Sequence, residues 1–215
     1  MLAAISTQTV WQFLKAGGPV MVPIGLCSVV VLAYALERCL ALRAARVRPR
    51  AFAQAIELAG SGQHAQALAT AAGVEAPATR ILAAGLRRRG ATLPEVERAI
   101  EDQGRKELER LRANIRPIAL MASISPLLGL FGTVFGILEA FHQVAEVGMG
   151  KPEMLARGIE FAGVATVAGL GVAIPATVLA SWLAGLVRRR LQEIDDRIAP
   201  LVESLVGRQE AGHAA

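Results

Sequence analysis

The sequence predicts an all-α membrane protein, with three transmembrane helices and long cytoplasmic helical extensions. Three long stretches contain no Asp, Glu, Lys, Arg or His: residues 16–36, 117–138 and 161–187. About 20 helical residues cross the hydrocarbon core of a bilayer, so each stretch can form a span. The composition agrees, because 53% of the residues are apolar and only 19% are charged, against about a quarter in soluble domains.

The placement of basic residues predicts how the spans are oriented. Arginine and lysine cluster after the first span, before the second and after the third, and few lie at the opposite ends. Positively charged segments stay in the cytoplasm. We therefore expect residues 37–116 and 188–215 in the cytoplasm. Residues 1–15 and a short loop, 139–160, would lie on the opposite side of the membrane. This placement also argues against nucleic-acid binding, although the net charge is +5.

The cytoplasmic region 37–116 is expected to be helical, with glycines marking its turns. Thr92-Leu93-Pro94-Glu95 matches a capping box, the start signal of a helix. We expect that helix to continue through Arg116 into the second span as one rod kinked at Pro117. Its many charged side chains would form a solvated face. Residues 188–196 would extend the third helix beyond the membrane in the same way.

Enzymatic, metal and cofactor chemistry find no support in the sequence. Cys27 and Cys39 are twelve residues apart and form no CxxC motif, so neither a disulfide framework nor a metal site is indicated. We find no nucleophile–base pair, carboxylate pair or metal-ligand cluster at catalytic spacing. We therefore expect the protein to be neither an enzyme nor a cofactor carrier.

Small and hydroxyl-bearing residues in the second and third spans predict close helix packing and a polar stripe. Ser125, Gly129 and Thr133 are spaced by four and share a helix face, and Gly132 and Gly136 form a GxxxG pair. Thr166 and Thr177 lie about three turns apart on one face of the third span. We expect helix packing at Gly129, Gly132, Gly136, Gly169 and Pro175.

Thr133 and Thr166 are predicted to lie at a similar depth. Each is six residues inside an acidic residue, Glu139 or Glu160, at the outer edge of its span. In an antiparallel hairpin both hydroxyls would then lie roughly 9 Å inside that edge. They could form a polar ring once subunits assemble, or each could bond back to a carbonyl of its own helix. The spacing alone leaves both readings open.

Two motifs in these spans resemble the MotA/TolQ/ExbB proton-channel family. Residues 125–134, SPLLGLFGTV, are similar to its signature second span. Residues 165–170, ATVAGL, followed by AIPA at 173–176, resemble its third-span motif. Glu37-Arg38 after the first span is similar to ExbB-like members. The likeness covers most of the chain, and three spans favour the ExbB/TolQ branch over the four-span MotA branch.

The resemblance implies a proton-channel subunit of a motor in the bacterial inner membrane, with the N-terminus in the periplasm and the C-terminus in the cytoplasm. Such a motor converts the proton-motive force into work across the envelope, energising outer-membrane transport. The resemblance also implies a homo-oligomer, a pentamer, around a dimer of a single-span ExbD-like or TolR-like partner that supplies a pore aspartate. A TonB-like or TolA-like protein would complete the system. Thr133 and Thr166 match the family's pore threonines, and Thr177 shares their stripe, so all three are expected to line the pore.

The sequence departs from the family pattern at the outer end of the third span. Many members carry an acidic or amide residue five positions before the third-span threonine, where this chain has Phe161 and places Glu160 one residue earlier. That shift turns the side chain by about 100°. Glu139, His142 and Glu160 are the candidates for proton access at the outer mouth. A histidine near a carboxylate can pass protons, although an ordinary surface histidine is the favoured interpretation of His142.

The spans themselves hold no Asp, Glu, Lys, Arg or His, and a proton path through lipid normally needs such a side chain. A threonine hydroxyl can hydrogen-bond or order water but does not titrate usefully near neutral pH. The titrating acid is therefore expected on the partner. Two alternatives to the motor channel stay open: a non-conducting oligomeric scaffold, and a TolQ-type subunit for envelope maintenance.

Overall fold

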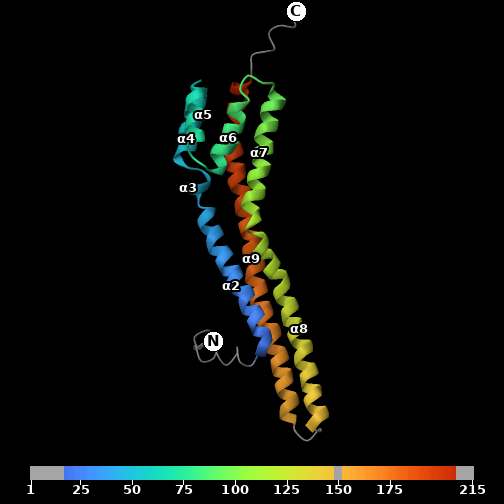
Figure 1. Ribbon diagram of the computed structural model, residues 1–215. Coiled ribbons are helices and arrows are strands. Elements are labelled where there is room, and N and C mark those ends of the chain that lie inside the picture. Colours follow the sequence, from blue (N-terminus) through green and yellow to red (C-terminus); the bar gives the residue numbers. More distant parts are fainter. Residues whose placement is uncertain (1–16, 148–151, 207–215) are drawn as a thin grey trace, which may run out of the picture. The chain divides into compact units, whose positions relative to one another are not determined.

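The computed structural model (Figure 1) describes residues 17–147 and 152–206. Every regular element in that part of the chain is a helix. The chain divides into two compact units. One, here called the membrane unit, contains the chain up to residue 36 and residues 115–181; the other, the extramembrane unit, contains residues 37–114 and those from 182 onward. The predicted all-α fold class is confirmed.

Long apolar helices build the membrane unit. They are α2 (Met21–Ala41), preceded by the short 3-10 helix η1 (Gly18–Val20), α8 (Arg116–Val147) and α9 (Pro152–Leu205). Within the described residues, three stretches are long and apolar enough to cross a membrane: Gly18–Ala41, Arg116–Glu146 and Leu155–Glu203. Many large apolar side chains on them are exposed, among them Leu127, Leu130, Val167 and Ile174. Such faces suit contact with lipid or with other membrane helices.

Residues 139–160, predicted as a loop, are mostly helical. Helix α8 continues to Val147 and α9 begins at Pro152. Residues 139–147 contain neither Gly nor Pro, and Gln143 Nε2 donates to Glu139 Oε1 at 2.9 Å, one turn away. Pro152 suits a first helical turn, because its fixed φ is helical and its missing N–H needs no partner there. The loop prediction was therefore wrong for most of this segment.

Short helices α3 to α6, helix α7 and the C-terminal part of α9 form the extramembrane unit. Their bounds are Ala44–Val47 (α3), Arg50–Gly60 (α4), His64–Ala72 (α5), Pro77–Arg87 (α6) and Leu93–Ala113 (α7). Buried side chains from α4, α6, α7 and α9 make its core, including Phe52, Leu82, Val96 and Ile198. Gly90, with φ of +83°, turns the chain between α6 and α7. Its amide donates to the carbonyl of Leu205 at 2.9 Å, which ties this turn to the end of α9.

Helices α7 and α8 are separate elements, whereas one kinked rod was predicted. Helix α7 ends at Ala113 and α8 begins at Arg116. Pro117 has no amide hydrogen, so a continuous helix would leave the Ala113 carbonyl without its partner. The chain instead restarts, with Pro117 in the first turn of α8, where a missing N–H costs nothing.

The capping box at the start of α7 is confirmed. The Glu95 carboxylate accepts the Thr92 amide at 3.0 Å and the Thr92 hydroxyl at 2.9 Å. The bond from the Thr92 amide has the larger effect and the bond from the Thr92 hydroxyl the smaller, and both lower the pKa of Glu95 below its ordinary value. The ionised carboxylate therefore holds the first turn of α7.

We expect Glu95→Ala to lower the thermal unfolding midpoint slightly at pH 7. Because folding lowers the pKa of Glu95, its contribution is present above the ordinary carboxyl pKa, about 4.3. It is lost as the pH falls through the lowered value. Wild type and variant should therefore converge in acid. Glu97→Ala, an exposed change on the same helix, should have no effect, and a gap that persists in acid would contradict this account.

One charged residue of α7 lies in the protein interior, although the charges of this helix were predicted to form a solvated face. The Glu107 side chain is completely buried. Arg80 of α6 donates to both its oxygens, from Nε at 2.8 Å and from a terminal nitrogen at 2.7 Å. Gln103 and Arg110 donate as well, at 2.8 and 3.3 Å. The hydrogen bonds to Glu107 raise the pKa of Arg80 above its ordinary value.

Candidate functional site

Helices α8 and α9 approach so closely that their contact positions have no room for side chains. A Cβ on Gly169 would lie 2.5 Å from the Ser125 carbonyl oxygen, and one on Gly129 would lie 3.0 Å from that of Ala165. A Cβ on Gly136 would lie 3.0 Å from the Gly158 oxygen. At Gly132 it would overlap the Ala165 methyl group. Glycines thus let two backbones meet, as in other closely packed membrane helices.

The glycines expected at helix contacts therefore lie where α8 meets α9, and Pro175 does not. Pro175 is exposed on α9. Gly158 makes a further contact that the sequence analysis missed, because a Cβ there would overlap Ala140 and lie 2.9 Å from the Gly136 oxygen. Its four-residue spacing from Ala162 was the available signal, as small residues repeated at that interval often mark helix contacts.

Two threonine hydroxyls are half-buried along this hairpin. Thr133 donates to the carbonyl of Leu130 in its own helix at 2.6 Å. Thr166 donates across the hairpin, to the carbonyl of Gly129 at 3.4 Å. The second bond depends on the glycine, because a Cβ on Gly129 would lie only 3.2 Å from the Thr166 Cα. Thr133 thus shows the back-bonding alternative, whereas Thr166 links α8 to α9.

The two threonines lie about one turn apart rather than at one depth. Thr166 is opposite Gly129, which precedes Thr133 by four residues, or about 6 Å along a helix. The predicted common depth assumed that Glu139 and Glu160 are level. The register is set instead by backbone contacts such as Gly136 against Gly158.

Two further hydroxyls flank this pair. Ser125 is fully buried and donates to the Met121 carbonyl at 2.7 Å. Thr177 is exposed and donates to the Ala173 carbonyl at 2.8 Å. In all four residues the hydroxyl proton is used by a carbonyl, so the oxygen lone pairs are what each group can offer to water or to an acid. The stripe can accept hydrogen bonds, and it carries no charge.

The ends of α8 and α9 that were predicted to face outward enclose a groove of about 390 Å³, here called the outer groove. Glu139, Arg157 and Glu160 all line it, together with Gln143 and Phe161. Two of the three residues expected at the outer mouth, Glu139 and Glu160, therefore share one groove. The third, His142, lies next to Glu146, with 3.4 Å between Nε2 and Oε1. Pairing of His142 with Glu139 was the less favoured interpretation of the sequence. In the structure the exposed His142 lies beside Glu146, four residues further along α8.

Phe161 occupies the position where an acidic or amide residue was expected from many family members, and it packs as a hydrophobic residue. Its ring centroid lies 6.2 Å from that of Phe135, which in turn lies 6.2 Å from that of Phe131. A Cβ on Gly136 would lie 2.5 Å from the Phe161 ring. The aromatic side chain therefore faces α8, while its neighbour Glu160 remains exposed in the groove.

The Glu37-Arg38 pair lies at the end of α2, in the extramembrane unit. Arg38 is 7% exposed and donates to both carboxylate oxygens of Glu37 at 2.6 Å. It also donates to the carbonyl of Leu111 at 3.1 Å, and Asn114 donates to Glu37 at 3.3 Å. An arginine on a free carbonyl stabilises the last turn of a helix. The pair thus fastens the end of α2 to the end of α7.

Comparison with known proteins identifies the family. Residues 73–196 match the model of the MotA/TolQ/ExbB proton channel family, a segment that includes all of α8 and both half-buried threonines. The chain belongs to this family. The resemblance drawn from the two span motifs is thereby confirmed, and the family is one of proton channels and transport-complex subunits rather than of enzymes. With three long apolar helices among its described residues, the chain is a multi-pass inner-membrane protein.

Relatives with curated names agree with the ExbB/TolQ branch. The chain is 42% identical over 73 residues to the Tol-Pal system protein TolQ of Haemophilus influenzae, covering 34% of this chain and 32% of that protein. It is 39% identical over 90 residues to the biopolymer transport protein ExbB of Aquifex aeolicus, covering 41% and 61%. The match to TolQ therefore spans about a third of that relative's length.

A solved structure of this family has the same fold. The structure of Campylobacter jejuni MotAB matches with a TM-score of 0.55 and 20% identity, over 88% of this chain and 75% of the other. At that identity the match supports the fold alone. The family's pore-lining threonines, its partner and its stoichiometry remain proposals for this chain.

Proposed function

We propose that this protein is the proton-channel subunit of an ExbB/TolQ-type motor, which uses the proton-motive force to do work across the envelope and energises outer-membrane transport. The observation that carries the proposal is the hydroxyl stripe of the α8–α9 hairpin. Thr133 and Thr166 lie half-buried on glycine-packed helices, within spans that lack any Asp, Glu, Lys, Arg or His. Such a surface can form the wall of a proton path, and the titrating group must come from another chain.

The proposed assembly is a homo-oligomer, a pentamer, around a dimer of a single-span ExbD-like or TolR-like partner whose aspartate enters the pore. A TonB-like or TolA-like protein would transmit the mechanical work across the envelope. Large exposed apolar side chains on α2, α8 and α9, including Val22, Phe131 and Trp182, support burial against neighbouring helices or lipid. The termini would follow the arginine distribution, with the N-terminus in the periplasm and the C-terminus in the cytoplasm.

The hydrogen bonds of the threonines suggest which form of the acid they recognise. Both hydroxyl protons are donated to carbonyls, those of Leu130 and Gly129. Each oxygen can then accept a hydrogen bond, as from the O–H of a protonated carboxylic acid or from water. We propose that the stripe stabilises the partner's aspartate in its neutral, proton-loaded form. Glu139 and Glu160, in the outer groove, would face the periplasmic source of protons.

Proton flux in vesicles that contain the protein and its partner tests this proposal. Uncoupler-sensitive flux in Thr166→Val or Thr133→Val is expected to fall several-fold, because a hydrogen bond between neutral groups contributes about 0.5–1.5 kcal/mol. Thr166→Ser should retain flux, since the hydroxyl remains. Ser123→Ala removes an exposed hydroxyl of α8 that also bonds its own helix, and it should behave as wild type.

The partner must still co-purify with each variant, so that lost flux is not lost assembly. Wild-type flux in both valine variants would refute the pore assignment. A wild-type complex without uncoupler-sensitive flux would instead support the non-conducting scaffold.

A TolQ-type role in envelope maintenance is the second candidate, favoured by the TolQ match at 42% identity. Expression in strains that lack either TolQ or ExbB separates the two. Restored resistance to detergent in the first strain would assign the TolQ role. Restored outer-membrane transport in the second would assign the ExbB role.

A further inference from the structure

The extramembrane unit contains a groove of about 600 Å³ between α7 and α9. Its floor is apolar and comes from both helices: Ile100, Leu108, Leu191, Ile198 and Val202. Acidic side chains line the same groove: Glu97, Glu101 and Asp195. None of these residues belongs to the hydroxyl stripe or to the outer groove of the membrane unit.

The charges of this groove are unbalanced. Among the described residues, Arg105 is the one basic residue that lines it, and it pairs with Glu101 of its own helix at 3.6 Å. Within the described part of the chain, neither Glu97 nor Asp195 has a cationic group within salt-bridge distance. An occupant that carries lysine or arginine would supply the missing charges.

The shape of the groove suits a short amphipathic helix. On α9 the lining runs from Leu191 to Val202, about 16 Å, or three turns. On α7 the groove passes Gly104, where an added Cβ would meet nothing within 4 Å. A segment with apolar side chains at helical spacing and basic residues beside them would bury the floor and neutralise its edges, as helices do in other apolar grooves.

We propose that this groove binds the cytoplasmic, lysine- and arginine-rich segment next to the span of the single-span partner. The inference rests on the proposed function, which requires that partner. Leu191 is only four residues beyond the third apolar stretch, so an occupant must lie near the membrane surface. Cytoplasmic segments beside a span are rich in lysine and arginine. A single-span partner therefore has both the required charge and the required location.

A second copy of this chain is the less favoured occupant. Two of its basic residues near the membrane, Arg48 and Arg190, are already paired with Glu193 at 3.0 and 3.1 Å. A neighbouring subunit would have to break such pairs before these arginines could enter the groove. The partner's basic segment could enter the groove without breaking these two ion pairs.

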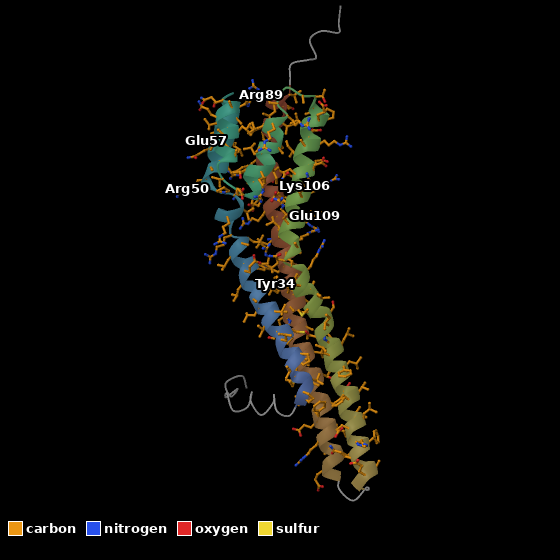
Figure 2. All side chains as sticks on the ribbon, viewed as in Figure 1. Tyr34, Arg50, Glu57, Arg89, Lys106 and Glu109 are labelled. Atoms are coloured by element: carbon orange, nitrogen blue, oxygen red, sulfur yellow. The ribbon has the colours of Figure 1, made fainter. Side chains whose placement is uncertain are left out.

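Site-specific photo-crosslinking in cells that make the whole complex tests the proposal. A photoreactive amino acid replaces Arg105 or Ala199, both exposed positions in the groove, and Glu109 serves as the control. Glu109, labelled on α7 in Figure 2, is exposed and does not line the groove. We expect an adduct with the partner from the two groove positions and none from Glu109. Mass spectrometry should place it in the partner's basic cytoplasmic segment.

Charge-reversal variants of the groove provide a second test of the proposal. Glu97→Lys with Asp195→Lys should lower the adduct yield several-fold, whereas Lys106→Glu, outside the groove, should not. Reversing the basic residues of the captured segment should restore the yield in the reversed protein.

The outcomes separate this inference from the proposed function. Adducts with a second copy of this chain, or an unchanged yield after charge reversal, would overturn the groove assignment. So would the absence of any adduct while the partner co-purifies and proton flux is normal, and the proposed function would then stand. A partner that neither co-purifies nor supports flux would overturn both.

Discussion

Replacing Gly169 with alanine is expected to separate α8 from α9, although alanine favours a helix. The added Cβ would lie 2.5 Å from the Ser125 carbonyl oxygen, 3.1 Å from the Gly129 Cα and 3.2 Å from its nitrogen. All three are backbone atoms, so no side-chain rotation can relieve the overlap. The helices must move apart, which also disturbs the Thr166 bond to Gly129 one turn away.

We expect a net loss of about 1–3 kcal/mol, the usual cost of overpacking, because this overlap outweighs the roughly 1 kcal/mol that alanine gains over glycine in a helix. Thermal unfolding of the full chain in mild detergent measures the loss. Hydrogen exchange should place it at the amides of α8 and α9. Proton flux with the partner should fall too, since the substitution shifts Thr166.

Gly163→Ala and Gly171→Ala are matched controls on the same helix. A Cβ at either position would meet nothing within 4 Å, so alanine should be neutral or mildly stabilising. A loss of stability in Gly169→Ala, with none in Gly163→Ala and Gly171→Ala, would show that backbone contact rather than helix propensity decides the change in stability. An unfolding midpoint for Gly169→Ala equal to that of the controls would refute the close packing.

The spans and several helix ends could be predicted because their causes are local. An uncharged stretch of about 20 residues is enough to indicate a span, and the Thr92–Glu95 cap needs only residues three positions apart. The register of the hairpin is different. It depends on which backbone positions of α8 and α9 meet, so counting inward from Glu139 and Glu160 placed Thr133 and Thr166 at one depth when they lie about a turn apart.

The same limit explains the charged residues that sequence reasoning misplaced. Glu107 shares the apolar face of α7 with Ile100 and Leu111, which its exposed neighbour Glu109 does not. That spacing alone does not show how a carboxylate can be buried there, because its partner lies on another helix, 27 residues away. His142 could be paired with a carboxylate three residues before it or four residues after it, and only the structure selects Glu146. Charged residues are easily counted in a sequence, but their burial is decided by tertiary contacts.

Glu107→Ala is expected to destabilise the extramembrane unit by about 3–5 kcal/mol, the usual cost of removing one partner from a buried ion pair. The variant loses both bonds from Arg80, and the Gln103 donor loses its acceptor. It also leaves a cavity between α6 and α7. The Arg80 side chain is 33% exposed, so water can screen part of the uncompensated charge, and we expect the lower end of that range.

Hydrogen exchange along α6 and α7, together with thermal unfolding in detergent, measures this effect in the full chain. Glu109→Ala removes an exposed carboxylate two residues away and should change stability by less than about 0.5 kcal/mol. Because the folded state raises the pKa of Arg80, the contribution of its charge should be present through the neutral range and be lost in strong alkali, where arginine loses its proton. Equal stability of the two variants would mean that Glu107 is solvated after all. A selective loss in Glu107→Ala would establish the α6–α7 ion pair as a structural element of the unit that carries the acidic groove.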